Sequence, residues 1–240
     1  MTGQPMKSFR ALSALLSYPT ADLQAAAPEI RGLLRAEGLF PGAQLAAMEP
    51  LLRGLQAGDL FDLQETYVLL FDRARSLSLN LFEHVHGESR DRGGAMVDLL
   101  DTYRAGGFDL TGAELPDHLP VVLEFLSTQT RAVAAGILAD AGPILVALAD
   151  RLGRRETPYA AVLAALVDFA SADPTTEAAQ TLLAEAMDDP TDMEALDATY
   201  AEAQVMFGPD PNAGCPAARD VLSRMAPLPA QAAPGAPALT

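Results

Sequence analysis

ELPDHLPVVLEFL, residues 114 to 126, decides the fold class because it joins a well-defined helix start to an apolar helical face. Pro116 favours an extended chain before the helix, and Asp117 is predicted to be the helix N-cap. His118 then opens the first turn, in which Pro120 removes no intrahelical hydrogen bond. The apolar residues that follow share one helix face: Leu119, Val122, Leu123 and Leu126.

The same spacing recurs along nearly the whole chain. The further apolar stripes are Phe9, Leu12, Leu15 and Leu16; Leu60, Leu63, Tyr67, Leu70 and Phe71; Met96, Leu99, Leu100 and Tyr103; Val133, Ile137 and Leu138; Val162, Leu163, Leu166 and Phe169; and Met193, Leu196, Tyr200 and Phe207. No stretch alternates apolar and polar residues in the manner of a strand. We therefore expect an all-α, single-domain helical bundle of about nine to eleven helices joined by short Gly- and Pro-containing loops.

Composition divides the chain. Residues 1–207 are expected to form the helical domain, and residues 208–225 a loop that could carry one short helix. Residues 226–240, APLPAQAAPGAPALT, form a Pro/Ala-rich tail that we expect to be disordered.

Charge and cysteine content exclude several classes of function. The formal net charge is -16, which should repel nucleic acid and anionic lipid and could attract a basic partner segment. The alternative is that the charge only keeps the protein soluble. Cys215 is the single cysteine, so neither an intramolecular disulfide nor a Cys-based zinc site can form, and no histidine lies near it in sequence to activate a catalytic thiol. The apolar runs are far shorter than the ~20 residues of a membrane span, and the N-terminal residues lack a signal-peptide pattern, so we expect a cytoplasmic protein without membrane insertion.

Glu114 and His118 are not required to start the helix that follows them. His118 lies at the positive end of that helix, which disfavours its protonated form. A neutral imidazole beside Glu114 and Asp117 suits a polar recognition site. It would also suit an acid/base pair of a small helical hydrolase, but no nucleophile or oxyanion site accompanies it.

A second informative stretch, residues 67 to 100, mixes aromatic and charged residues. His84 and His86 are two apart, so on a helix they point about 200° apart and cannot share a metal ion. They could do so only if the helix had already ended there and His118 converged on them, and we expect no metal site. Arg90 and Arg92 suit phosphate recognition, although no Gly-rich phosphate loop is present, or a solvated face whose ion pairs each contribute less than ~1 kcal/mol.

Three segments carry a family resemblance: LLSYP (15–19), LFDRARSLSLNLFEHVHGESRDRGGAMVDLL (70–100) and ELPDHLPVVLEFL (114–126). Together they resemble the nitrate reductase assembly chaperones of the NarJ type, within the wider NarJ/TorD/DmsD family of redox-enzyme maturation proteins. The resemblance covers roughly residues 6 to 207. The acid-x-Pro-Asp-His block is common to the wider family, whereas the 70–100 block indicates the NarJ branch.

This resemblance implies a TorD-like, cytoplasmic, all-helical chaperone and no enzyme. Such a chaperone binds the N-terminal segment of the nitrate reductase catalytic (alpha) subunit in its apo form. It holds the subunit competent for insertion of the bis-guanine-dinucleotide molybdenum cofactor and for membrane assembly, and it is absent from the mature enzyme. It would carry no cofactor of its own and would be a monomer or a weak homodimer. Alternatives are a chaperone of the same family for an S- or N-oxide reductase and a purely structural helical scaffold.

The resemblance also assigns candidate residues for client binding. The family block carries this role to Glu114, Pro116, Asp117 and His118. The branch block carries it more weakly to Tyr67, Phe71, Asp72, His84, His86, Arg90 and Arg92. In a compatible mechanism, an amphipathic client helix enters a groove lined by Phe71, Leu81 and Phe82, and its basic end meets Glu114 and Asp117. The charge of His118 would then make affinity depend on pH.

Overall fold

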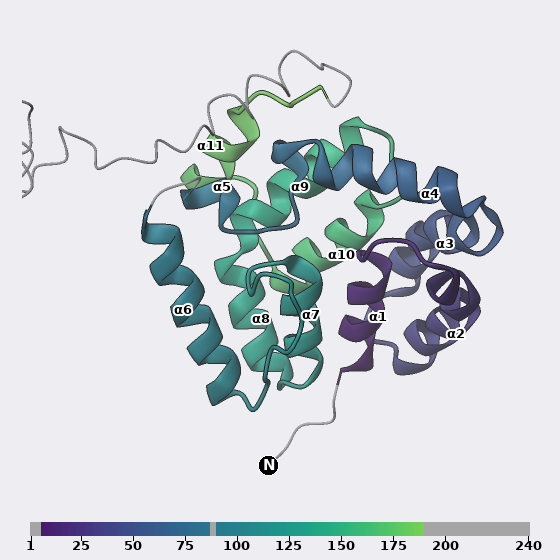
Figure 1. Cartoon of the computed structure of the whole chain (residues 1–240), viewed down its shortest axis with the longest axis horizontal. Helices are drawn as coiled ribbons and strands as arrows, with labels where there is room; N and C mark the ends of the chain where they lie inside the picture. Colours follow the sequence, from purple (N-terminus) through teal and green to yellow (C-terminus); the bar gives the residue numbers. More distant parts are fainter. Residues whose placement is uncertain (1–5, 87–89, 190–240) are drawn as a thin grey trace, which may run out of the picture. The chain divides into compact units, whose positions relative to one another are not determined.

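The computed structural model of the chain describes residues 6–86 and 90–189 (Figure 1). Within these residues the α-helices are α1 (Lys7–Leu15), α2 (Ala21–Glu37), α3 (Gly42–Ala57), α4 (Leu60–Tyr67), α5 (Glu83–His86), α6 (Arg90–Ala105), α7 (Leu119–Ser127), α8 (Arg131–Asp140), α9 (Gly142–Arg154), α10 (Ala160–Ala170) and α11 (Glu177–Ala184). A π-helical turn, η1 (Val68–Asp72), and a 3₁₀ turn, η2 (Arg75–Leu77), follow α4. The described part of the chain contains no strand, only an isolated bridge between Asn80 and His118, so the all-α prediction is confirmed.

The helices pack in two neighbouring groups. α1 lies against α7 and α2, and α2 lies against α3, while α9 lies against α10 and α11. α10 also contacts α3 and α8 and so connects the groups. Phe9 of α1 and Phe169 of α10 meet edge-on, with ring centroids 5.0 Å apart, at this junction. In Figure 1, α6 runs along the flank away from α2 and α3, with α7 and α8 between.

Polar caps define where several helices begin. The side chains of Thr20, Thr130 and Thr176 each accept a hydrogen bond from a backbone N–H in the first turn of α2, α8 and α11. Asp59 caps α4 in the same way. Each cap satisfies a backbone N–H that has no partner within its helix, and is typically worth about 1 kcal/mol.

Arg151 of α9 is a buried cation that connects distant segments. Its side chain is 2% exposed and donates to the carbonyl oxygens of Ser76 and Leu182, at 2.8 and 2.6 Å, and to the carboxylate of Glu185 at 3.1 Å. These bonds hold η2 and the end of α11 against α9. A buried guanidinium is stable only when such acceptors surround it.

The predicted domain boundaries and the predicted absence of a membrane span can be compared with the described residues only in part. The stripe from Met193 to Phe207, the segments 208–225 and 226–240, and Cys215 all lie outside them, so the domain boundaries stay predictions. In the part that the structure describes, no single helix is long and apolar enough to span a membrane. Only α8 and α9 taken together meet the criteria of length and composition, and they are bent by 72° relative to each other.

Candidate binding groove

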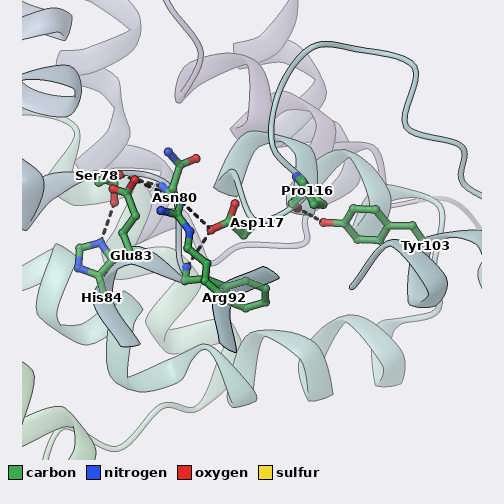
Figure 2. Close-up of polar contacts among 9 residues, drawn as sticks. Ser78, Asn80, Glu83, His84, Arg92, Tyr103, Pro116 and Asp117 are labelled. Atoms are coloured by element: carbon green, nitrogen blue, oxygen red, sulfur yellow. Dashed lines mark hydrogen bonds and ion pairs between the residues drawn. The ribbon is translucent and has the colours of Figure 1, made fainter. Parts of the chain in front are cut away.

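The block at 114–118 is held by the segment that precedes α5. The backbone N–H of Leu119 donates to the carbonyl oxygen of Leu79 at 2.8 Å, and that of Leu81 donates to the carbonyl oxygen of Asp117 at 3.0 Å. On the other side, the hydroxyl of Tyr103 donates to the carbonyl oxygen of Pro116 at 2.6 Å, as Figure 2 shows. The start of α7 is therefore fixed from both sides by residues far away in sequence.

The Asp117 side chain is fully buried and points toward this preceding segment. Its Oδ2 accepts the backbone N–H of Phe82 at 3.0 Å and lies 3.8 Å from the guanidinium of Arg92, which also donates to Glu83 at 3.2 Å (Figure 2). Burial raises the pKa of the Asp117 carboxyl, although the Phe82 N–H and Arg92 act in the opposite direction. Asp117 thus connects α7 to the segment around α5 and is closed to a partner.

The prediction that Asp117 caps α7 is wrong. The N-cap residue is His118, and its side chain makes no capping hydrogen bond. The Asp117 carboxylate accepts the backbone N–H of Phe82 instead, and the N–H of Leu119 at the helix start donates to the carbonyl oxygen of Leu79.

Glu114 is exposed to solvent, and His118 lies beside it and is only partly buried. The His118 Nδ1 lies 3.7 Å from Glu114 Oε2, and the two side chains are 18% and 67% exposed. Burial lowers the pKa of His118, while Glu114, Asp117 and Asp72 act to raise it. The imidazole is therefore neutral at neutral pH, and its Nδ1 is buried without a hydrogen-bond partner.

The π-helical turn brings Asp72 to the same place. η1 follows α4 directly, with Leu70 and Phe71 buried and Asp72 exposed. Burial raises the pKa of Asp72, with His118 lowering it and Glu114 raising it, which places these three groups within electrostatic range. Beside them, the hydroxyl of Tyr67 donates to the carbonyl oxygen of Leu16 at 2.9 Å. π-Helical turns are frequent at functional sites because the extra residue redirects side chains.

These residues lie at one end of an open groove of about 1100 Å³ between α1, α2 and α7. The groove wall is largely apolar, with Ala11 and Ala14 from α1, Ala26 and Leu33 from α2, and Val121 from α7. Small side chains on α1 and α2 leave the space open. The acidic and basic residues of the lining are Lys7, Arg10, Asp22, Glu29, Asp72, Glu114, His118 and Glu124.

Several sequence-predicted residues do not reach this groove. Phe71 and Leu81 were expected to line it, yet they are only 6% and 5% exposed and belong to the hydrophobic core. Phe82 is partly buried, and its ring meets that of His86 edge-on at 5.8 Å. The apolar pattern is the same for core and groove, so it could not separate them.

The two histidines of the branch block also have structural surroundings. The Nε2 of His84 lies 2.8 Å from the carbonyl oxygen of Ser78, and burial lowers the pKa of His84 (Figure 2). His86 packs on Phe82 instead. Among the described residues, no group of three His, Cys, Asp or Glu side chains could hold a metal ion. Arg90 is the first residue of α6, and its predicted role in client binding stays a prediction.

Sequence reasoning missed the walls that α1 and α2 contribute. The connection between these two helices adds Tyr18, which is 45% exposed and meets Tyr67 edge-on at 5.6 Å. An aromatic residue in the LLSYP segment was the available signal. The alanines carried none, because alanine is unremarkable in any helix.

An open, mostly apolar groove on a helical bundle is typical of a protein that binds a segment of a partner. The hydrolase hypothesis needed Glu114, Asp117 and His118 at one accessible centre, and Asp117 is buried away from it. The fold itself is shared with a protein of known structure. A crystal structure of a candidate redox enzyme maturation protein from Archaeoglobus fulgidus matches 71% of this chain and 96% of its own, with a TM-score of 0.52 and 22% identity.

The family follows from sequence comparison. The profile of the nitrate reductase delta subunit family matches residues 23–165, and the chain belongs to this family. The nitrate reductase molybdenum cofactor assembly chaperone NarJ of Escherichia coli K12 is 43% identical over 204 residues, which are 85% of this chain and 86% of the relative. A second protein of that organism, named "Probable nitrate reductase molybdenum cofactor assembly chaperone NarW", is 36% identical over 211 residues, 88% of this chain and 87% of its own. The resemblance to the NarJ-type chaperones is thereby confirmed, and these relatives are named as chaperones, not as enzymes.

Proposed function

We propose that this protein is the assembly chaperone of a nitrate reductase and that it binds the N-terminal segment of the catalytic subunit in the groove between α1, α2 and α7. The observation that carries the proposal is the groove itself, since it is open, apolar and bordered by Glu114 and His118 of the family block. The names of the relatives supply the client, and they favour nitrate reductase over an S- or N-oxide reductase.

The groove suits an amphipathic helix. Such a helix buries its apolar face against a hydrophobic wall and leaves its polar face in water. The alanines on α1 and α2 allow the backbone of the client helix to approach closely, and the exposed ring of Tyr18 can cover one end of it. Polar client groups would meet the exposed carboxylate of Glu114 at the rim, beside the imidazole of His118.

A chaperone must also release its client. We therefore expect a dissociation constant in the micromolar range or one to two decades below it, because tighter complexes dissociate too slowly. In this proposal the chaperone acts in the cytoplasm on the apo subunit, keeps it open for insertion of the molybdenum cofactor, and leaves before the reductase is complete. It acts as a monomer or a weak homodimer.

Two neighbouring alanines of α2 provide a matched test. Ala26 lines the groove, whereas Ala25 is exposed and does not. A synthetic peptide of the first ~20 residues of the catalytic subunit, about 30 Å long as a helix, would be titrated calorimetrically into the wild-type chain, Ala26→Trp and Ala25→Trp. We expect saturable binding to wild type and Ala25→Trp, and at least about tenfold weaker binding to Ala26→Trp because the indole fills the groove. Equal affinity of all three proteins would show that the client binds elsewhere.

A further inference from the structure

We infer that the groove is electrically polar and therefore binds its client in one direction, with the cationic N-terminal end of the client helix beside Asp22, Asp72 and Glu114. The inference rests on the proposed function, because it assigns the orientation and the chemistry of the segment that the groove would bind.

The directions of the three helices define the two ends of the groove. The carboxylate of Glu37, at the end of α2, accepts the backbone N–H of Lys7 at 2.9 Å, so α2 runs antiparallel to α1. α7 does so too, because Ser13 donates to the carbonyl oxygen of Pro120 while the N–H of Met6 donates to that of Ser127. The C-terminal end of α1 therefore lies with the starts of α2 and α7.

That end carries an excess of negative charge. Asp22 lies in the first turn of α2, Glu114 precedes α7, and η1 adds Asp72, whereas no Lys or Arg lines the groove there. His118 does not compensate, since burial lowers its pKa and leaves it neutral. This end, bordered by Tyr18, is called the acidic end below.

The rest of the groove is close to neutral. Arg10 lies 4.0 Å from Glu124 across the middle, and Glu29 is halfway along α2. Lys7 stands at the far end. Both cations of the lining are therefore remote from the acidic end, and the potential changes from negative to near zero along the groove.

The dipoles of α2 and α7 oppose this gradient but do not remove it. Both helices begin at the acidic end, and each helix start is equivalent to about half a positive charge. The two starts together offset about one of the three carboxylates. A net negative charge remains, and it favours the positive end of a bound helix together with any ammonium or basic side chain there.

The client helix would consequently run antiparallel to α1 and parallel to α2 and α7. A segment with a free amino group near its first turn fits this arrangement, while an acidic or acetylated start does not. The three carboxylates thus act as determinants of specificity, whereas the apolar wall supplies the affinity for any amphipathic helix.

A charge cycle tests the role of the acidic end. The client peptide would be compared with a free and with an acetylated N-terminus on wild type, on Asp72→Asn/Glu114→Gln and on Lys7→Gln/Arg10→Gln. Acetylation should weaken binding to wild type by about threefold to tenfold, as expected for a few exposed charge pairs. The effect should persist in Lys7→Gln/Arg10→Gln and disappear in Asp72→Asn/Glu114→Gln. An acetylation effect that is the same in all three proteins, or that disappears only in Lys7→Gln/Arg10→Gln, overturns the inference.

Orientation can be measured directly because the chain contains no tryptophan. Tyr18→Trp places a fluorophore at the acidic end, and Leu33→Trp places one nearer the other end. A nitroxide on a side chain near the N-terminus of the peptide, with the amine left free, should quench the first variant more strongly. A nitroxide near the C-terminus of the peptide should quench the second more strongly. The reverse pattern, or equal quenching, contradicts the orientation while leaving the client assignment intact; absence of saturable binding to wild type overturns both.

Discussion

We predict that replacement of Asp117 by alanine destabilises the fold. The size of this loss shows whether Asp117 has a structural role or a role in client binding. The side chain is fully buried, and the variant removes the hydrogen bond from Phe82 N–H at 3.0 Å together with the 3.8 Å approach of Arg92. A hydrogen bond to a buried charged group contributes about 1.5–3 kcal/mol to stability. Loss of the Asp117–Arg92 contact costs less than the ~3–5 kcal/mol of a broken, fully buried ion pair, because Arg92 still donates to Glu83 at 3.2 Å. The total is about 2–4 kcal/mol.

Urea denaturation followed by circular dichroism measures this loss. With a slope of about 2–3 kcal/mol per molar urea for a domain of this size, the midpoint should fall by roughly 1 M. Asp117→Asn is the matched variant, since its amide oxygen can still accept from Phe82 and it avoids the burial cost that raises the pKa of the Asp117 carboxyl. We expect it to lose about 1 kcal/mol or less. An alanine variant with an unchanged midpoint but without client binding would refute the structural role; if that variant does not fold, an asparagine variant with a loss as large as 3 kcal/mol would do so.

Three further perturbations test other parts of the structure. Gly106→Ala should destabilise the fold by about 1–3 kcal/mol, because the added Cβ would lie 2.5 Å from a ring carbon of Phe125; a melting temperature equal to wild type would contradict that packing. Arg151→Ala should cost roughly 3 kcal/mol by leaving buried carbonyl oxygens without donors, whereas Arg154→Ala, whose partner and own side chain are solvent-accessible, should cost less than ~0.5 kcal/mol in the same urea titration. The pKa of His118 is lowered in the folded state, so its contribution to stability is complete above its unfolded value of about 6.5 and is lost as the pH falls below it. His118→Gln should therefore reduce the loss of stability between pH 8 and pH 5, and an unchanged pH profile would show that the imidazole is not a relevant titrating group.

The helical pattern was predictable because it depends on many side chains at once. The stripe at 119–126 and the stripe from Phe9 to Leu16 became α7 and α1, which bury those faces against each other. The stripe from Leu60 to Phe71 was predicted as one helix, yet α4 ends at Tyr67 and η1 follows. A π-helical turn is set by tertiary packing, and no local residue preference indicates it.

The hydrogen-bond partners of single polar side chains were less predictable, because these partners can lie far away in the sequence. The carboxylate of Asp117 accepts a backbone N–H 35 residues away, which is invisible to a rule that looks only at the next helical turn. Phe71 and Leu81 had the apolar character that a groove requires, but burial in the core satisfies the same pattern. The groove could not be predicted because it is formed by small side chains such as that of Ala26, and an alanine in a helix does not indicate a groove.

The block at 114–118 therefore combines two functions that a binding assay alone cannot separate. Pro116 and Asp117 face inward and fix the chain, while Glu114 and His118 border the groove. His118 follows Asp117 directly and pairs with Asn80 across the isolated bridge, so a disturbance at Asp117 moves the imidazole as well. A variant of the buried pair would then lose client binding without ever having contacted the client. Within this block, only substitutions at Glu114 or His118 that keep wild-type stability report on recognition, and binding and stability must be measured on the same variants.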